Sequence, residues 1–569
     1  MNKFFQILCL CIAFSTIQTI AQSPNWTFAH RDGGSKLDVG RTITIDDNGN
    51  IYIAGTFNGA TSIIGTDTLL RTLTHSNIGS SIFIAKYDSL GNNLWAKGFG
   101  STHNDTYLSN IVSDPAGNIY LSGSFSDSIT FGSFILTTPD TMFGTLFVAP
   151  YRTFTAKLDG SGNVLWAKTI EGGDYFDANL TRSIALDKNN NLFLLGEFSG
   201  QLNFAANTLT NGGLFLSKYD DNGNELWIKS WTTDGLIGGL SRMDIDSSDH
   251  FYIGGGFRDS LFTLDSQTLV NTSSGNTDIF VMKTDPLGQI IWLKSAGGTL
   301  DDQLYSLAVS RQGELSVTGA FNSPSLTLGG NTVNCINCQS NGYAMFSAHL
   351  DLSGFFTWSF AGDKFSGGYG MKIDDNGNSY FTGDFHDTLV FDTTHVYALY
   401  RSDLYVAKIS ALGNLIWAKT AGGSNSDIGY GIAFDYSGNS YVTGCFFSDT
   451  IHFDSFGLLN APGDSGDFFV AKIGNSPVGI LEVSNSSVLA LHYQATSQTA
   501  VLSTQKLNGK SYLLQVLDMN GKVIFREQGH LTSSTFSTSI NMESFSGGMY
   551  IISLKTDIEY VAGKIVIPD

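Results

Sequence analysis

Short stretches in which apolar and polar residues alternate follow one another along most of the chain, separated by turns rich in Gly, Asn and Asp. Residues 404–446 show this most clearly, with the stretches LYVAKI, LIWAK, GIAFD and SYVTGCF. Alternation with a period of two is typical of a β-strand that buries one face. Gly-Asn pairs at 413–414 and 438–439 are turn residues that hairpins favour. The stretch therefore predicts two consecutive hairpins.

This pair of hairpins recurs. The first hairpin, strands A and B around a turn of the form D-x-x-G-N, has seven copies, at residues 45–57, 113–125, 186–198, 245–257, 309–321, 373–385 and 434–446. A second hairpin, strands C and D, follows the copies, and strand D carries a tryptophan in six of them: Trp95, Trp166, Trp227, Trp292, Trp358 and Trp417. A period of roughly 60 to 70 residues indicates a repeat architecture.

The two ends of the series predict how it closes. The seventh copy has a strand C, FFVAKIG at 468–474, but no tryptophan strand after it. Residues 25–30, NWTFAH, followed by Asp32-Gly33-Gly34, resemble the missing LWAK…GG segment. A first strand that completes the last repeat is expected in a closed ring, which leaves no exposed sheet edge. We therefore predict an all-β fold in which residues 22–478 form a seven-bladed β-propeller closed by an N-terminal strand.

A second pattern begins after residue 478. Residues 479–510 are predicted to be a linker and the first strand or strands of a C-terminal domain. Residues 511–569 contain a hairpin around Asn520-Gly521 and further alternating stretches at 545–556 and 561–568. We expect a small C-terminal β-sandwich.

Residues 1–21 have the features of a secretory signal peptide, namely Lys3, an apolar run over 4–14 and a small-residue site at 19–21. No later stretch approaches the roughly 18 apolar residues of a membrane span. The formal net charge of −20 argues against nucleic acid and anionic membranes as partners. The three cysteines after the leader are too few for a disulfide framework, and Cys335 and Cys338 are open to a local disulfide or to free thiols.

The G-N-x-Y-x-x-G units resemble the seven-bladed β-propeller repeat (SBBP-type) of secreted bacterial proteins, a family with no shared catalytic motif. The segments LQVLDMNGKVIFRE, SGGMYIISLKT and the final Lys564-Ile565-Val566 resemble the type A sorting domain of the type IX secretion system in Bacteroidota. The resemblance implies export to the outer cell surface or the medium, with the secretion machinery as a partner. It also implies a sorting motif made of Asp518, Gly521, Lys522, Gly547, Gly548, Tyr550 and Lys564.

Antiparallel strands would place the short A–B and C–D turns on one face of a propeller and the longer B–C and D–A loops on the other. Variable loops on a rigid scaffold usually carry function, so the B–C/D–A face is the candidate ligand-binding face. Its carboxylates follow strand B or precede strand A: Asp127, Asp259, Asp387, Asp449, Asp38, Asp105, Asp177, Asp302 and Asp427. They are interpreted either as a ring that binds cations or polyols, or as the solvated rim of an acidic protein.

Other candidate chemistry has less support. Asp46-x-Asn48-x-Asn50 partly resembles a calcium loop, but the chelating Glu is absent, and Asx capping of the turn explains these residues without metal. We expect no cofactor, with Ca²⁺ as the alternative. The ten histidines lack a ligand spacing, and the Gly-Asp-Ser-Gly at 463–466 lacks a triad context.

The sequence therefore predicts a secreted or surface-attached, non-enzymatic binding or adhesion module whose ligand is a glycan or a surface protein. One alternative is a carbohydrate-active hydrolase or lyase that uses carboxylates of the B–C/D–A face, and another is a purely structural surface protein with no small-molecule site. A fold by itself does not decide between them.

Overall fold

The computed structural model describes residues 24–71, 79–100, 106–138, 141–143, 146–148, 151–172, 179–232, 241–271, 273, 275–335, 342–391, 394–398, 401–435, 437–460, 465–474, 489–494, 499–504, 511–517, 523–531, 536–545, 548–556 and 560–567. The chain divides into two compact units, which we call the repeat unit (Ser23–Asn475) and the C-terminal unit (Ser476–Asp569, grouped with residues 1–22). The predicted signal peptide, residues 1–21, lies outside the described residues. All regular elements of the described residues are β-strands.

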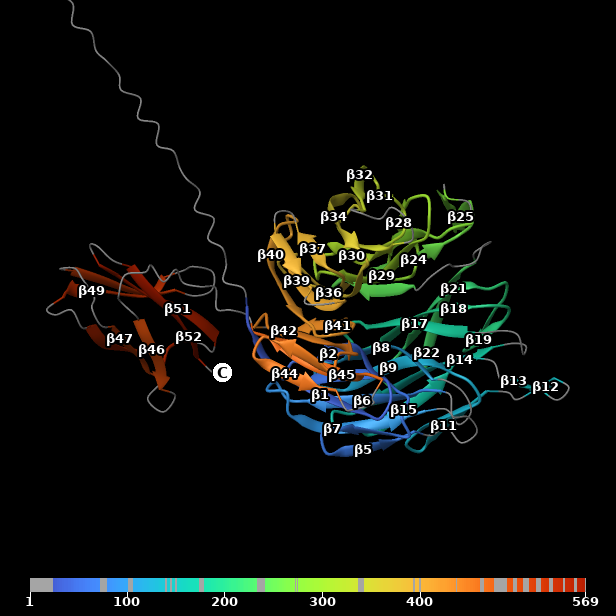
Figure 1. The fold of residues 1–569 in the computed structure, drawn as a ribbon, viewed down its shortest axis with the longest axis horizontal. Coiled ribbons are helices and arrows are strands. Elements are labelled where there is room, and N and C mark those ends of the chain that lie inside the picture. The colour runs from blue at the N-terminus through green and yellow to red at the C-terminus, as the bar shows by residue number, and fades with distance from the viewer. Residues whose placement is uncertain are drawn as a thin grey trace, which may run out of the picture. The chain divides into compact units, whose positions relative to one another are not determined.

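The repeat unit contains seven four-stranded antiparallel arrays, which we call modules 1 to 7, each with strands A to D in spatial order (Figure 1). Modules 1 to 3 are β2 (Asp38–Ile45), β3 (Ile51–Phe57), β6 (Ser81–Tyr87) and β7 (Asn93–Phe99); β8 (Tyr107–Ser113), β9 (Ile119–Phe125), β14 (Arg152–Leu158) and β15 (Val164–Thr169); and β17 (Asn179–Leu186), β18 (Leu192–Phe198), β21 (Gly213–Tyr219) and β22 (Glu225–Trp231).

The remaining modules follow the same order of strands. Modules 4 to 7 are β23 (Arg242–Ile245), β24 (Phe251–Phe257), β27 (Asp278–Thr284) and β28 (Ile290–Gly297); β29 (Asp302–Val309), β30 (Leu315–Phe321), β33 (Ala344–Leu350) and β34 (Phe356–Lys364); β35 (Ser366–Ile373), β36 (Ser379–Phe385), β39 (Asp403–Ile409) and β40 (Leu415–Ala421); and β41 (Asp427–Phe434), β42 (Ser440–Phe446), β45 (Asp467–Ile473) and β1 (Trp26–Gly34).

Each module also carries a short hairpin between strands B and C, because a second apolar stretch follows strand B. Figure 1 shows these hairpins toward the outside of the repeat unit. They are β4 (Thr61–Ile64) with β5 (Asp67–Leu70), β10 (Ser128–Phe131) with β11 (Phe134–Thr137), β19 (Leu202–Phe204) with β20 (Asn207–Leu209), β25 (Leu261–Leu264) with β26 (Gln267–Val270), β31 (Ser325–Leu328) with β32 (Asn331–Asn334), β37 (Thr388–Phe391) with β38 (Thr394–Tyr397), and β43 (Thr450–Phe453) with β44 (Phe456–Leu459). Module 2 adds β12 (Thr141–Phe143) with β13 (Leu146–Val148), and β16 (Glu171–Gly172) pairs with β19.

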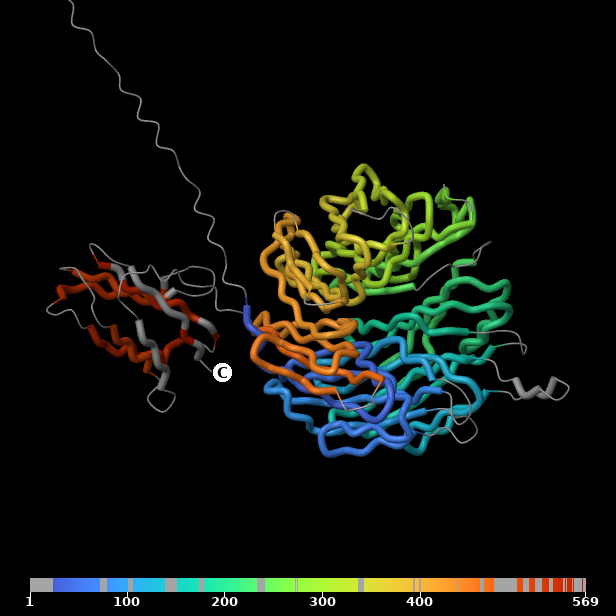
Figure 2. The backbone as a smooth tube through the Cα atoms, viewed as in Figure 1, coloured from blue at the N-terminus to red at the C-terminus, as the bar shows by residue number. Residues whose placement is uncertain are grey.

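The first strand of the chain completes the last module. β1 pairs antiparallel with β45, from Trp26 opposite Ile473 to Asp32 opposite Phe468. Figure 2 shows this N-terminal strand, in blue, among the orange strands of module 7. Phe28 lies opposite Lys472, the position that tryptophan takes opposite lysine in module 1, where Trp95 faces Lys86. Phe28 therefore replaces the repeat tryptophan, and Trp26 lies two residues before it.

Tryptophan recurs in strand D because it packs against the next module. The indole of Trp95 donates a hydrogen bond to the Gly160 carbonyl of module 2, over 3.2 Å. A Cβ on Gly162 would lie only 3.2–3.3 Å from atoms of the same ring, a tight contact, and the φ of +81° at this glycine disfavours other residues. On the same face, the Lys86 ammonium also donates to the Gly160 carbonyl, over 2.9 Å, and lies 5.0 Å from the centre of the Tyr52 ring, within cation–π range.

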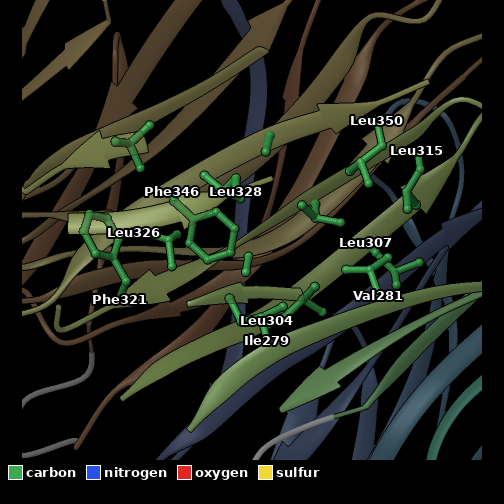
Figure 3. Packing of buried hydrophobic residues seen from close by; sticks show 14 of the residues in the cluster. Ile279, Val281, Leu304, Leu307, Leu315, Phe321, Leu326, Leu328, Phe346 and Leu350 are labelled. Carbon is green, nitrogen blue, oxygen red and sulfur yellow. The ribbon is translucent and has the colours of Figure 1, made fainter. Parts of the chain in front are cut away.

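Hydrophobic cores fill the spaces between consecutive modules. Figure 3 shows the core between modules 4 and 5, where Ile279 and Val281 pack with Leu304 and Leu307. Equivalent clusters join modules 1–2, 2–3, 3–4, 5–6 and 6–7, and one more, with Phe28, Ile43 and Phe468, joins module 7 to module 1. The A strands also contact one another in series, and the last of them, β41, contacts the first, β2.

The described residues of the C-terminal unit form two sheets. One has the order β46 (Leu489–Gln494), β47 (Thr499–Thr504), β50 (Phe536–Asn541), and the other β49 (Val523–His530), β48 (Ser511–Leu517), β51 (Gly548–Thr556), β52 (Tyr560–Ile567). Buried side chains of both sheets, among them Leu502, Leu514 and Ile552, belong to one hydrophobic cluster.

Candidate functional site

Three of the predicted site carboxylates, which begin strands A, lie inside the protein. Asp38, Asp302 and Asp427 are fully buried. Each accepts a hydrogen bond from a serine of the following B–C segment; for Asp302 the donor is the Ser323 hydroxyl, at 2.9 Å. The expectation of an exposed acidic ring is therefore wrong at these positions, because a hydrogen-bonded interior carboxylate is not presented to a ligand.

The acids that follow strand B have a role in the added hairpins. The carbonyls of Asp127, Asp387 and Asp449 accept the hydrogen bond that closes the hairpin of their module, at 2.7, 2.8 and 2.9 Å. Asp127 is buried and has a φ of 73°, a turn conformation that Asp tolerates better than most residues. Asp387 and Asp449 are exposed and Asp259 is partly exposed. Asp105 and Asp177 lie outside the described residues.

Burial has a strong effect on two of the interior acids. It raises the pKa of Asp302 and of Asp427 from the ordinary 3.8 to about 7, and the nearby carboxylates of Asp278 and Asp403 add to the rise, while the serine hydrogen bonds oppose it. These two acids therefore hold protons at pH values where an unfolded chain has released them.

This difference predicts a pH-dependent stability. Between about pH 4 and pH 7 the native state binds more protons than the unfolded state, so the free energy of unfolding falls as the pH rises and levels off above about 7. Replacing both acids (Asp302→Asn with Asp427→Asn) should remove much of this slope and raise the stability at pH 8, on the order of 2–4 kcal/mol per site. Urea unfolding at pH 5 and pH 8 measures the free energy of unfolding of both proteins. An unchanged pH dependence in the double variant would contradict the assignment of this dependence to Asp302 and Asp427.

The aspartates of the A–B turns use their oxygens within the turn. Asp46 Oδ1 accepts hydrogen bonds from the backbone N–H groups of Asn48 and Asn50, and Oδ2 accepts from the Asn50 amide and the Tyr52 hydroxyl, all within 3.0 Å. This is the Asx capping that the sequence favoured over a calcium loop. Within the described part of the chain, no three His, Cys, Asp or Glu residues are grouped so as to hold a metal.

A cavity of about 930 Å³, which we call the mouth cavity, lies where all seven A strands begin. Its wall includes Arg41, Ser109, Arg182, Arg242, Tyr305, Tyr369 and Tyr430 from the A strands, with Asn58, Ser80 and Tyr151 from the B–C segments. A smaller cavity of about 340 Å³, the inner cavity, is lined by residues further along the same strands, Asp244 and Lys372 among them. The mouth cavity thus opens on the B–C/D–A side, but none of the predicted site carboxylates that are described lines it.

In six of the seven A strands, a β-bulge directs one side chain into the mouth cavity. In β2 the register against β3 slips between Gly40 and Thr42, which leaves Arg41 as the extra residue. The same slip occurs in modules 2, 3, 5, 6 and 7, where the extra residues are Ser109, Arg182, Tyr305, Tyr369 and Tyr430. All six line the mouth cavity, and in module 4 the first residue of β23, Arg242, does so. Bulges of this kind re-aim a side chain and are frequent beside functional sites.

Sequence reasoning missed these residues although a signal was present. Each bulge residue lies five positions before the residue that begins the A–B turn, as Arg41 does before Asp46 and Tyr369 before Asp374. The turn residues are nearly uniform and attract attention, whereas the bulge position holds arginine in two copies, serine in one and tyrosine in three. That variation at a fixed place on a repeated scaffold is the signal.

The bulge tyrosines form a continuous aromatic arc. The rings of Tyr305 and Tyr369 are stacked with centroids 5.4 Å apart, and Tyr369 and Tyr430 are also 5.4 Å apart. The Arg41 guanidinium lies over the Tyr430 ring, 5.4 Å from its centroid. Burial raises the pKa of all three tyrosines above the ordinary 10, so their hydroxyls are neutral donors and acceptors.

Arginines form the other side of the mouth cavity. The Arg182 guanidinium pairs with the Glu197 carboxylate at 2.8 Å, and Arg242 Nε donates to the Tyr305 carbonyl at 2.9 Å. Burial and the neighbouring Arg182 lower the pKa of Arg242 to about 10, which still leaves it cationic at neutral pH. The mouth cavity can therefore offer guanidinium N–H groups and aromatic faces to one ligand.

Two family models match the chain. The model described as "Beta-propeller repeat" matches residues 33–60 and 416–444, and the "Secretion system C-terminal sorting domain" matches residues 494–568. The chain thus carries β-propeller repeats and a type IX sorting domain. The sorting domain directs the protein to the medium or the outer cell surface and implies an interaction with the secretion machinery. A search of the described residues for helices long and apolar enough to cross a membrane finds none.

The structure describes part of the predicted sorting motif. Gly548 and Tyr550 lie in β51, where the Tyr550 ring is buried against Phe545, and Lys564 lies in β52, opposite Ile551. Asp518, Gly521, Lys522 and Gly547 lie outside the described residues. In the repeat unit, Cys445 is a buried free thiol and Cys335 is disulfide-bonded, whereas Cys338 lies outside the described residues.

Other proteins resemble this propeller-repeat protein more distantly. An uncharacterized WD repeat-containing protein, L264, of Acanthamoeba polyphaga mimivirus is 25% identical over 546 residues, which cover 87% of this chain and 35% of that protein. The chain thus spans about a third of the length of the relative. A protein of unknown function from Bacteroides caccae has 12% identity and a TM-score of 0.28, covering 59% of this chain and 89% of its own. A DUF4221 family member from Bacteroides vulgatus has 13% identity and a TM-score of 0.25, covering 52% and 92%.

Proposed function

We propose that the repeat unit is a closed seven-bladed β-propeller which, after export, acts as a non-enzymatic binding or adhesion module, and that the mouth cavity binds its ligand, a glycan or a surface protein. The observation that carries the binding proposal is that the bulge side chains of six A strands, together with Arg242 of the seventh, line one cavity. A scaffold that only had to fold would not need arginine or tyrosine at five of its six bulges.

Closure has independent support. Inter-module cores form an unbroken series that includes module 7 with module 1, and β1 completes module 7. At six junctions a backbone N–H near the start of the A-strand region also donates to the carbonyl before strand C of the preceding module, as Asp38 does to Gly466 at 2.9 Å. The shared core of the two C-terminal sheets likewise supports a β-sandwich.

The enzyme alternative, a hydrolase or lyase, has less support. Glycoside hydrolysis ordinarily needs two carboxyl groups on either side of the bond that breaks. The residues lining the mouth cavity include no Asp or Glu, and the inner cavity has Asp244 as its one lining acid among the described residues.

A glycan array probed with the exported chain, residues 22–569, tests the proposal. We expect saturable binding that falls at least tenfold in Tyr369→Ala, because this ring lies in the middle of the aromatic arc. Tyr397→Ala is the matched control, since Tyr397 is 66% exposed on an added hairpin and does not line the cavity. Melting temperatures of both variants separate lost binding from lost folding. Equal binding by the two variants would place the ligand elsewhere.

A further inference from the structure

The charges of the mouth cavity are opposite in sign to the charge of the protein. The chain has a formal net charge of −20 and ten arginines, and three of these, Arg41, Arg182 and Arg242, line the mouth cavity. Among the described residues, neither a carboxylate nor a lysine lines this cavity. A local group of cations on an anionic protein attracts an anion to that place, while the rest of the surface repels it.

Placing the guanidinium groups of Arg182 and Arg242 near each other costs electrostatic free energy. Arg182 and Arg242 are close enough to repel each other, and the Glu197 carboxylate compensates only one of the two charges. Glu197 is itself held by the Ser241 hydroxyl at 2.9 Å. An uncompensated, half-buried positive charge is more stable with an anionic partner than without one, so the pair is prepared for an anion.

Donors remain for that anion. Arg182 Nη2 is engaged with Glu197 and its Nε is buried, which leaves Nη1, without a hydrogen bond to any of the described residues, as the donor for a ligand. Arg242 directs Nε and Nη1 to backbone carbonyls and therefore keeps its second terminal nitrogen for a ligand. Arg41 is exposed and stacks on Tyr430, so its planar group faces solvent with its N–H donors available. Guanidinium forks match the two oxygens of a carboxylate or sulfate group.

The aromatic arc indicates which kind of molecule bears the anionic group. Flat aromatic faces bind the apolar face of a sugar ring, and the arc offers such faces. The Tyr369 hydroxyl is itself hydrogen-bonded to the buried Asp384 carboxyl, which holds the ring in place. The volume of about 930 Å³ lies near the upper end of the range for cavities that hold small ligands.

From this combination we infer that the mouth cavity recognises an acidic sugar chain, a polysaccharide whose residues carry carboxylate or sulfate groups, with the anionic group on the arginines and a sugar ring on the bulge tyrosines. The inference rests on the proposed binding function and adds the class of ligand. Neutral glycans, which leave the guanidinium groups unpaired, bind more weakly.

Titration calorimetry of the exported chain with three probes tests the inference: an oligogalacturonate, a sulfated galactan oligosaccharide and a neutral galactan oligosaccharide of the same length. We expect at least tenfold tighter binding of one anionic probe than of the neutral one, with affinity that falls as salt is raised. The anionic probe that binds identifies the group as carboxylate or sulfate. Equal affinity for the neutral probe would overturn the inference and leave the proposed function intact. Binding of none of the three would overturn the inference, and a glycan array without any binder would overturn the glycan part of the proposed function separately.

Two arginine variants make the test specific. Arg41→Gln should lower the affinity for the anionic probe at least tenfold and leave the weak binding of the neutral probe unchanged. The substitution removes a positive charge and the paired N–H donors of the guanidinium group from an exposed side chain. Arg311→Gln is the matched control, since it changes the net charge equally at a residue of an A–B turn, where the side chain is 66% exposed and pairs with Asp375. Equal losses in both variants would show a general charge effect and contradict the assigned site. Arg41→Lys keeps the positive charge but loses the paired guanidinium donors. Its affinity for the anionic probe should lie between those of Arg41→Gln and the unmodified protein.

Discussion

Removing residues 24–34 from the exported chain should leave the repeat unit unable to fold. These residues contain β1, whose buried Trp26 and Phe28 belong to the cores between modules 6 and 7 and between modules 7 and 1. Loss of a buried aromatic side chain costs about 3–5 kcal/mol, and two such losses consume much of the typical 5–15 kcal/mol stability of a protein. The deletion also exposes the edge of β45, which invites aggregation.

Solubility, circular dichroism and the melting temperature of the chain expressed without its leader measure the effect. Single substitutions at one position give the controls. Phe28→Ala should lower stability by about 3–5 kcal/mol, whereas Phe28→Trp should cost little, because tryptophan takes the equivalent position in six other modules. A soluble deletion variant with an unchanged melting temperature would show that β1 is dispensable.

Removing residues 494–569 should abolish delivery to the cell surface and the medium. The deleted segment contains the matched sorting domain, and the repeat unit is a separate compact unit that keeps its own cores. We therefore expect a folded protein that accumulates in the periplasm, with at least a tenfold fall in the extracellular and surface fractions. Fractionation and protease treatment of intact cells measure this.

The reverse experiment is a transfer of residues 476–569 to an unrelated periplasmic protein, which should then appear outside the cell. A truncated chain that still reaches the surface in normal amounts would show that the sorting information lies elsewhere. Retention of an unfolded chain would be a different result, and the melting temperature of the retained protein distinguishes the two.

Much of the repeat could be predicted because its signals are local. The turn at Asp46 and the packing of Trp95 depend on residues close in sequence or at a fixed repeat distance, so the pattern of the chain contains them. The strand that completes module 7 was also predictable, because the seventh copy of the repeat has no strand D of its own after strand C. The position of Phe28 was not, because its register against Lys472 depends on a pairing across more than 400 residues.

The candidate site could not be predicted in the same way. The acids at the starts of strands A were conspicuous in sequence, but Asp302 and Asp427 turned out to be interior groups whose hydroxyl partners come from a segment about 20 residues later. The bulge residues depend on a one-residue slip between strands, which no residue type specifies. Arg41 and Tyr430 meet only because the modules containing the first and last A strands are neighbours in space.

The pairing of β1 with β45 also orders events in time. The strand that leaves the ribosome first has its partner more than 400 residues later, so it waits through the synthesis and passage of nearly the whole repeat unit. Joining such distant segments carries a loop-closure entropy that short hairpins avoid, and it is expected to be a late step of folding. A chain interrupted before residue 467 never supplies that partner, and its first strand stays accessible to proteases. The pairing of β1 with β45 can therefore form only after the whole repeat unit has been synthesised.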